Sequence, residues 1–159
     1  MKKILIIEDD TSISQELYQL LTNSGYEAEI LKDFSDAKSQ VLKSGADLIL
    51  LDIHIPVLNG ELLLKEIRKE SDVPVIIVTS KNSEADEVLS MSYGADDYIT
   101  KPYSPTVLLF RIQNIFKRLE PKKDKCKYQD LEVHLSKGII CSKTEEIRLT
   151  KNEMIIFSY

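Results

Sequence analysis

The sequence predicts an α/β fold, a doubly wound parallel sheet built from five strand–helix units, (βα)5. Short runs of continuously apolar residues, such as Leu48–Leu51, are typical of strands that helices cover on both faces. Longer stretches with helical spacing of apolar residues lie between these runs. The alternation repeats five times before a polar, proline-containing segment around residue 120, which is the pattern of a parallel sheet with crossover helices.

Each strand and helix has its own signals. The five strands are expected at residues 3–7, 26–31, 48–51, 75–78 and 97–100. The five helices are expected at residues 12–23, 35–43, 61–69, 83–93 and 104–118. Ser12 with Gln15 and Ser83 with Asp86 have the spacing of a capping box, and Pro105 suits the first position of the last helix. Glycines follow the first, second and fourth helices, where they favour a helix end.

Composition indicates a folded protein without a membrane segment. The 159 residues are 43% hydrophobic, which is enough for a packed core. The longest apolar runs have the length of strands and no leader-like segment precedes Lys2, so we expect a cytoplasmic protein. Cys126 and Cys141 lie too far apart for a Cys-x-x-Cys motif and are expected to be incidental thiols.

Charge divides the chain near Phe116. Up to that residue there are 11 basic and 19 acidic residues, and after it there are 10 basic and 7 acidic ones. The polar stretch that follows is typical of a linker, so we expect a domain at residues 1–118, a linker at 119–126 and a second segment at 127–159. The basic second segment indicates nucleic acid only weakly, because an ordinary solvated surface has the same balance of charge.

Polar groups follow four of the predicted strands. Glu8 and Asp9 follow the first strand, Asp52 the third, Thr79 the fourth and Lys101 the fifth. Because open parallel sheets bind ligands at the carboxyl ends of their strands, we expect these side chains to share one pocket. Carboxylates without a soft donor nearby favour Mg²⁺, and a lysine with a hydroxyl suits a phosphoryl group. In such a pocket Asp52 could attack phosphorus.

Each of these residues also has a purely structural interpretation. The acidic residues after the first strand, including Asp10, could cap the next helix, and Asp52 could belong to a turn. Thr79 could cap a helix, and Lys101 could be a solvated surface charge. Capping does not account for all of these groups at four neighbouring strand ends, so a common pocket is the preferred interpretation.

Four segments resemble the receiver domain of two-component response regulators, which has a flavodoxin-like fold. They are ILIIEDD at residues 4–10, LDIHIP at 51–56 with Gly60, VTS at 78–80, and GADDYITKPYSP at 94–105. The resemblance covers about residues 1–120. It implies a phosphorylation-controlled protein that takes a phosphoryl group from a separate sensor histidine kinase, so His54 and His134 are not expected to be phosphodonors. It also implies no enzyme activity beyond self-catalysed phosphoryl transfer and autodephosphorylation.

The resemblance implies a role for each residue of the pocket. Asp52 would be the phosphoryl acceptor, and Thr79 and Lys101 would contact the phosphoryl group. Thr79 and Tyr98 would form the switch, with Tyr98 turning inward on activation, and the bond between Lys101 and Pro102 would be cis. The ligands of Mg²⁺ would be Glu8, Asp9, Asp52 and the backbone carbonyl of His54.

The fifth strand and the helix after it resemble those of OmpR/PhoB-type regulators. The matching residues are the segment 96–102, Arg111 and the basic pair at 117–118. When phosphorylated, such regulators dimerise through the surface of the fourth helix, fifth strand and fifth helix, and Asp97 and Arg111 could form an ion pair across that dimer. Val107 stands where a glutamate is usual, so one further ion pair is in doubt and dimerisation is expected to be altered.

The residues after the linker resemble the antiparallel β platform that opens a winged-helix DNA-binding domain. Short strands are expected at 128–135, 139–142 and 147–149, and a helix is expected to start at Thr150 with Glu153 as its capping-box partner. No recognition helix or wing follows in this sequence, so DNA binding is expected only where the effector domain is complete. The alternatives are a stand-alone receiver that dimerises with or titrates partners and, more remotely, a Mg²⁺-dependent aspartyl phosphatase.

Overall fold

The computed structural model describes residues 1–121 and four strand segments beyond them, at 125–128, 131–134, 139–141 and 146–148. The chain divides into two compact units, Met1–Arg118 and Leu119–Tyr159. In the described part of the chain, no helix is both long enough and apolar enough to cross a bilayer.

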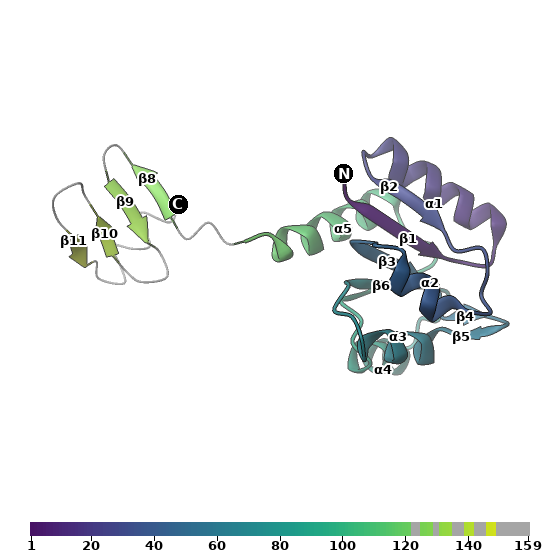
Figure 1. Cartoon of the computed structure of the whole chain (residues 1–159). Coiled ribbons are helices and arrows are strands. Elements are labelled where there is room, and N and C mark those ends of the chain that lie inside the picture. The colour runs from purple at the N-terminus through teal and green to yellow at the C-terminus, as the bar shows by residue number, and fades with distance from the viewer. Residues whose placement is uncertain (122–124, 129–130, 135–138, 142–145, 149–159) are drawn as a thin grey trace. The chain divides into compact units, whose positions relative to one another are not determined.

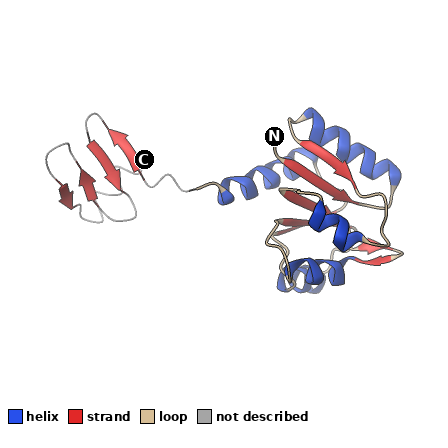
Figure 2. Cartoon of the chain, in the orientation of Figure 1, coloured by secondary structure: helices blue, strands red, loops and turns tan. Residues whose placement is uncertain are grey.

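The first unit alternates strands and helices in the expected order (Figures 1 and 2). Its strands are β1 Lys3–Ile7, β2 Glu27–Ile30, β3 Leu48–Leu51, β4 His54–Ile55, β5 Leu58–Asn59, β6 Val75–Thr79 and β7 Asp97–Thr100. Its helices are α1 Thr11–Asn23, α2 Ala37–Lys43, α3 Gly60–Arg68, α4 Glu84–Ser92 and α5 Pro105–Leu119.

Five of these strands form one parallel sheet in the order β2-β1-β3-β6-β7. The register pairs Ile7 with Leu51 and Thr79 with Thr100, so the carboxyl ends of β1 and β3 lie level, as do those of β6 and β7. The sheet first grows outward from β1 to β2 and then grows the other way from β3, and ligands of open α/β sheets bind at such a switch point. The predicted doubly wound α/β fold is confirmed.

Both faces of this sheet are buried under helices (Figure 1). One face packs against α1 and α5, and its buried side chains include Ile4, Ile6, Leu17, Leu21, Leu108 and Ile112. The other packs against α2 and α3, and its buried side chains include Leu5, Ile7, Val41, Leu63, Leu64 and Ile67. Each fully buried side chain of this size contributes about 1.5–3 kcal/mol relative to exposure, so the two cores hold the strand ends firmly in place.

The start of α1 differs from the expectation because Asp10, not Ser12, is its N-cap. The Asp10 carboxylate accepts hydrogen bonds from the backbone N–H groups of Ser12 and Ile13 at 2.9 and 3.1 Å. These bonds satisfy donors that the first helical turn leaves free. At α4 the expected Ser83 cap is present, and its hydroxyl accepts from the N–H three residues later at 3.1 Å.

Two further local differences surround the sheet. The helix expected from residue 35 begins at Ala37, because the N–H and hydroxyl of Ser35 donate to Asp33 at 2.9 and 2.6 Å and hold a turn there. The segment after β3, expected to be a loop, contains the small antiparallel hairpin β4–β5, which pairs His54 with Asn59. This hairpin matters because it begins two residues after Asp52.

The described strands of the second unit form an antiparallel sheet in the order β11-β10-β9-β8. They are β8 Lys125–Tyr128, β9 Leu131–His134, β10 Ile139–Cys141 and β11 Glu146–Arg148. Of the strand expected at 128–135, the structure has β9 and the last residue of β8, and β8 begins inside the expected linker. The expected helix start at 150–153 lies outside the described residues.

Candidate functional site

Three carboxylates meet at the carboxyl ends of β1 and β3. Glu8 and Asp52 are each only 6% exposed, whereas Asp9 is exposed. One carboxylate oxygen from each of the three residues lies within 4.8 Å of the others. Oxygen donors at this spacing could hold a hard divalent cation, which is the donor set expected for Mg²⁺.

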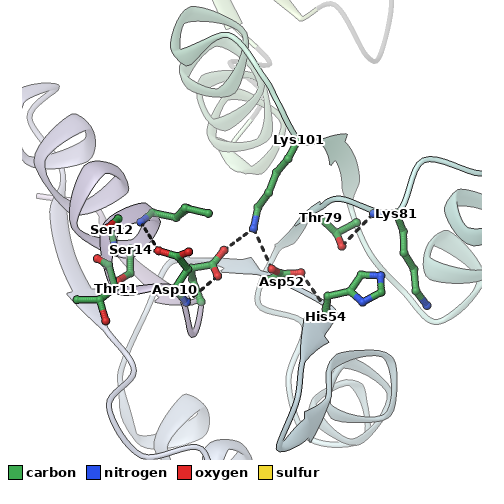
Figure 3. A network of polar contacts seen from close by, with 11 residues as sticks. Asp10, Thr11, Ser12, Ser14, Asp52, His54, Thr79, Lys81 and Lys101 are labelled. Atoms are coloured by element: carbon green, nitrogen blue, oxygen red, sulfur yellow. Dashed lines mark hydrogen bonds and ion pairs between the residues drawn. The ribbon is translucent and has the colours of Figure 1, made fainter.

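Lys101 joins this cluster from the end of β7 (Figure 3). Its Nζ donates to Glu8 Oε2 at 2.5 Å and to Asp52 Oδ2 at 2.9 Å, and the peptide bond to Pro102 is cis. Burial opposes the charged ammonium, but these two bonds outweigh it and raise the pKa of Lys101 above its ordinary value. The lysine therefore stays charged and compensates part of the acidic cluster.

The cluster is nevertheless short of positive charge, since three carboxylates face one ammonium. Burial raises the pKa of the Glu8 carboxyl above its ordinary value of 4.5, against the lowering effect of the hydrogen bond from Lys101. Glu8 Oε1 also accepts from the Asp10 N–H at 3.0 Å, so the backbone of the residue that caps α1 is hydrogen-bonded to the acidic cluster. A bound cation would relieve this excess of negative charge.

The hairpin after β3 fixes the Asp52 carboxylate. Asp52 Oδ1 accepts from the His54 N–H at 2.8 Å, while Oδ2 faces Lys101 (Figure 3). Gly60 closes the loop behind it, because a Cβ there would lie 2.6 Å from Ile53 Cα and 2.9 Å from the Asp52 carbonyl oxygen. The contact needs a residue without a side chain.

Thr79 and Tyr98 are linked through the backbone of Lys81. Thr79 is fully buried, and its Oγ1 accepts a long hydrogen bond of 3.4 Å from the Lys81 N–H. The Tyr98 hydroxyl donates to the Lys81 carbonyl at 2.7 Å, and the residue is only 7% exposed. Tyr98, expected to turn inward on activation, is thus already inside in this structure, because its ring packs in the core and its hydroxyl has a partner.

The two residues expected on a dimer surface contact each other within this chain. Arg111 Nη1 lies 2.7 Å from Asp97 Oδ1, and the Arg111 side chain is 43% exposed. On the same helix Val107 is 44% exposed. An ion pair across a dimer stays a prediction and would have to compete with this internal pair.

Glu61 is the charged neighbour of the site that the sequence did not single out. It lies in the first turn of α3, where an acidic residue is common for helix stability alone. In the structure its Oε1 lies 3.5 Å from Lys81 Nζ. Only the fold brings these two residues together, because 20 positions of sequence separate them.

Residues 4–113 match the family model for the response regulator receiver domain. The chain belongs to this family. Response regulator receivers are signalling domains rather than classical enzymes.

Curated proteins with similar sequences are longer than this chain. Sensory transduction protein RegX3 of Mycolicibacterium smegmatis is 42% identical over 118 residues, which are 74% of this chain and 52% of that protein. Response regulator ArlR of Staphylococcus aureus is 35% identical over 153 residues, which are 96% of this chain and 69% of that protein. The chain spans about half the length of the RegX3 relatives it matches.

Solved receiver structures share the fold. A two-component response regulator from Clostridium difficile superposes with a TM-score of 0.72 at 27% identity and covers 76% of this chain and 100% of its own. The BeF3-activated N-terminal receiver domain of RstA from Klebsiella pneumoniae gives a TM-score of 0.68 at 30% identity, covering 71% and 97%. The matched shares agree with the size of the first unit.

Proposed function

We propose that this chain is a phosphorylation-controlled receiver in which Asp52 accepts a phosphoryl group from a sensor histidine kinase. The observation that carries the proposal is the position of the Asp52 carboxylate, buried at the switch point of the sheet with the Lys101 ammonium 2.9 Å away. A buried carboxylate beside a fixed cation can attack phosphorus while the cation neutralises the incoming charge.

Mg²⁺ is the cofactor that the donor set fits. Glu8, Asp9 and Asp52 would hold it through carboxylate oxygens, and the His54 backbone carbonyl would be a further ligand. When bound, the ion supplies positive charge that withdraws electron density from the transferred group. The excess of carboxylates over ammonium groups in the cluster supports a divalent cation.

Side chains of the site would carry out the phosphoryl transfer and then contact the transferred group. An Asp52 carboxylate oxygen forms the new bond to phosphorus as the bond from phosphorus to the donor histidine breaks. Lys101 would then pair with a phosphoryl oxygen instead of the free carboxylate. The Thr79 hydroxyl, whose oxygen accepts a long hydrogen bond from the Lys81 N–H, would donate its own proton to another phosphoryl oxygen.

The output side follows the OmpR/PhoB type in this proposal. Phosphorylation would favour a homodimer through the surface of α4, β7 and α5, where Val88 and Phe110 are 64% and 61% exposed. The match to ArlR continues past the first unit, which supports the second unit as the start of a winged-helix effector domain. Transcription control would need the complete effector, in a cytoplasmic setting.

Mass spectrometry tests the site directly. The chain, incubated with a small acyl-phosphate donor and Mg²⁺, is expected to gain one phosphoryl group, and Asp52→Asn is expected to gain none. Asp36→Asn is a matched control, because the Asp36 side chain makes no capping bond at the start of α2. Labelling of Asp52→Asn at the normal rate would refute the assignment.

A further inference from the structure

The backbone of Lys81 contacts two residues of the proposed switch, and its side chain points elsewhere. Its backbone N–H and carbonyl contact the two proposed switch residues, Thr79 and Tyr98, at 3.4 and 2.7 Å. Its side chain points away from both Lys101 and Thr79, the two proposed phosphoryl-contacting residues (Figure 3). The backbone and the side chain of one residue therefore serve different neighbours.

The Lys81 ammonium lies between two acidic residues on different helices. Its Nζ is 3.5 Å from Glu61 Oε1 at the start of α3 and 3.9 Å from Asp86 Oδ1 in the first turn of α4. The side chains of Lys81 and Glu61 are 31% and 18% exposed. The pair is thus partly shielded from solvent, where an ion pair is screened less than on an open surface.

Glu61 depends on this lysine more than the reverse. Its Oε1 atom is buried and has no hydrogen-bond partner among the described residues, so the Lys81 ammonium at 3.5 Å is its nearest compensating charge there. A buried acceptor without a hydrogen bond is costly, which favours any loop position that keeps Lys81 close. Lys81 itself retains Asp86 when Glu61 is removed.

Open space lies beside the pair. A surface hollow of about 390 Å³ is bordered by both residues and by the β4–β5 hairpin, including His54 and Asn59. The lysine side chain therefore has unfilled space beside it, outside the buried core.

We propose that Glu61 and Lys81 form an ionic latch that positions the β6–α4 loop and so keeps Tyr98 inside. The latch fixes the Lys81 main chain, whose carbonyl holds the Tyr98 hydroxyl. Opening the latch frees this carbonyl to move and releases Tyr98. Glu61 is accordingly a positioning residue, because it acts through Lys81 and not on the phosphoryl group itself. The effect of the latch on signalling rests on the proposed function, whereas the existence of the latch does not.

Tyrosine-ring NMR on the unphosphorylated full chain tests the latch. With ¹³C-labelled tyrosine, the Tyr98 signal is identified by its loss in Tyr98→Phe. Glu61→Gln and Lys81→Gln are each expected to move that signal toward the position of an exposed ring, with a change of about fivefold in the ratio of inward to outward forms. The double variant is expected to match Lys81→Gln, because that change already breaks the contact with Glu61 together with the one to Asp86.

Glu66→Gln is the matched control, since it makes the same chemical change in the same helix and removes a pairing with Lys69 instead. It should leave the Tyr98 signal in place. A Tyr98 signal that stays unmoved in both Glu61→Gln and Lys81→Gln, or that moves equally in Glu66→Gln, overturns the latch. Acyl-phosphate labelling of Glu61→Gln at Asp52 is measured separately, so a failure of the proposed function is distinguished from a failure of the latch.

Discussion

Replacing Lys101 by methionine should destabilise the metal-free chain strongly at pH 7 and only slightly at pH 5. Methionine keeps most of the apolar length of lysine but removes the ammonium that lies 2.9 Å from Asp52 and also contacts Glu8. Both carboxylates are buried, and breaking a buried ion pair from one side costs about 3–5 kcal/mol.

Protonation of Glu8 limits that loss. At pH 7, protonating a carboxyl with an ordinary pKa of 4.5 costs about 3.4 kcal/mol, because the pH lies about 2.5 units above that pKa and each unit is worth about 1.36 kcal/mol. At pH 5 the same route costs only about 0.7 kcal/mol. Burial raises the pKa of Glu8 in the folded chain, so the folded chain binds this proton more tightly than the unfolded chain does. Proton binding at Glu8 therefore stabilises the fold fully below pH 4.5, and this stabilisation is lost as the pH rises through the folded-state pKa. We therefore expect a loss of about 3 kcal/mol at pH 7 and below about 1 kcal/mol at pH 5.

Urea unfolding followed by circular dichroism at the two pH values measures this difference. Lys38→Met serves as the control, because the Lys38 ammonium pairs with Glu70 on the surface and its loss should leave the free energy of unfolding nearly unchanged. Added Mg²⁺ should return part of the loss in Lys101→Met at pH 7. An equal loss at pH 5 and pH 7 would refute the reasoning that Glu8 takes up the uncompensated charge.

Three further substitutions test other contacts. Asp10→Ala should cost about 1 kcal/mol in thermal unfolding through loss of the α1 cap, with phosphoryl labelling retained, and loss of labelling would show that Asp10 does more than cap. Tyr98→Phe should cost about 1 kcal/mol by leaving the Lys81 carbonyl without its donor. Burial raises the pKa of Tyr98, as it does for Tyr26 and Tyr103, so the same variant should remove one of the tyrosines that ionise above the ordinary value in an ultraviolet pH titration, and an unchanged titration curve would contradict this. Gly60→Ala should cost about 1–3 kcal/mol or more because its methyl group would collide with the Ile53 backbone, and full stability in urea would count against the tight closure of that loop.

The strand and helix order could be predicted because the apolar pattern is unusually clear. Continuous apolar runs such as Leu48–Leu51 indicate strands of a sheet that helices cover on both faces, and the structure buries these four residues. The starts of α1 and α2 were missed because several side chains compete locally for the same backbone donors. Asp10 outcompetes Ser12 as a cap, and the turn at Asp33 delays α2 by two residues.

The site was predictable in its members but not in its bonds. Parallel strands bring Glu8, Asp52 and Lys101 to one edge of the sheet, so their proximity follows from topology. That Lys101 would bond to both carboxylates at once depends on side-chain positions, which sequence spacing does not determine. The Glu61–Lys81 pair depends on how the β6–α4 loop meets α3, and no periodic pattern encodes such a loop contact.

The closure at Gly60 has a consequence for how this protein can change over evolution. Surface loops usually accept added residues at small cost, because the entropy of closing a loop grows slowly with its length. Here the hairpin returns to touch the main chain at Asp52 and Ile53 where it began, with no room even for a methyl group. An inserted residue would have to reopen that contact and so displace Asp52 itself. Variation in length is therefore expected at other turns of the domain, while the segment from Ile53 to Gly60 should keep its number of residues.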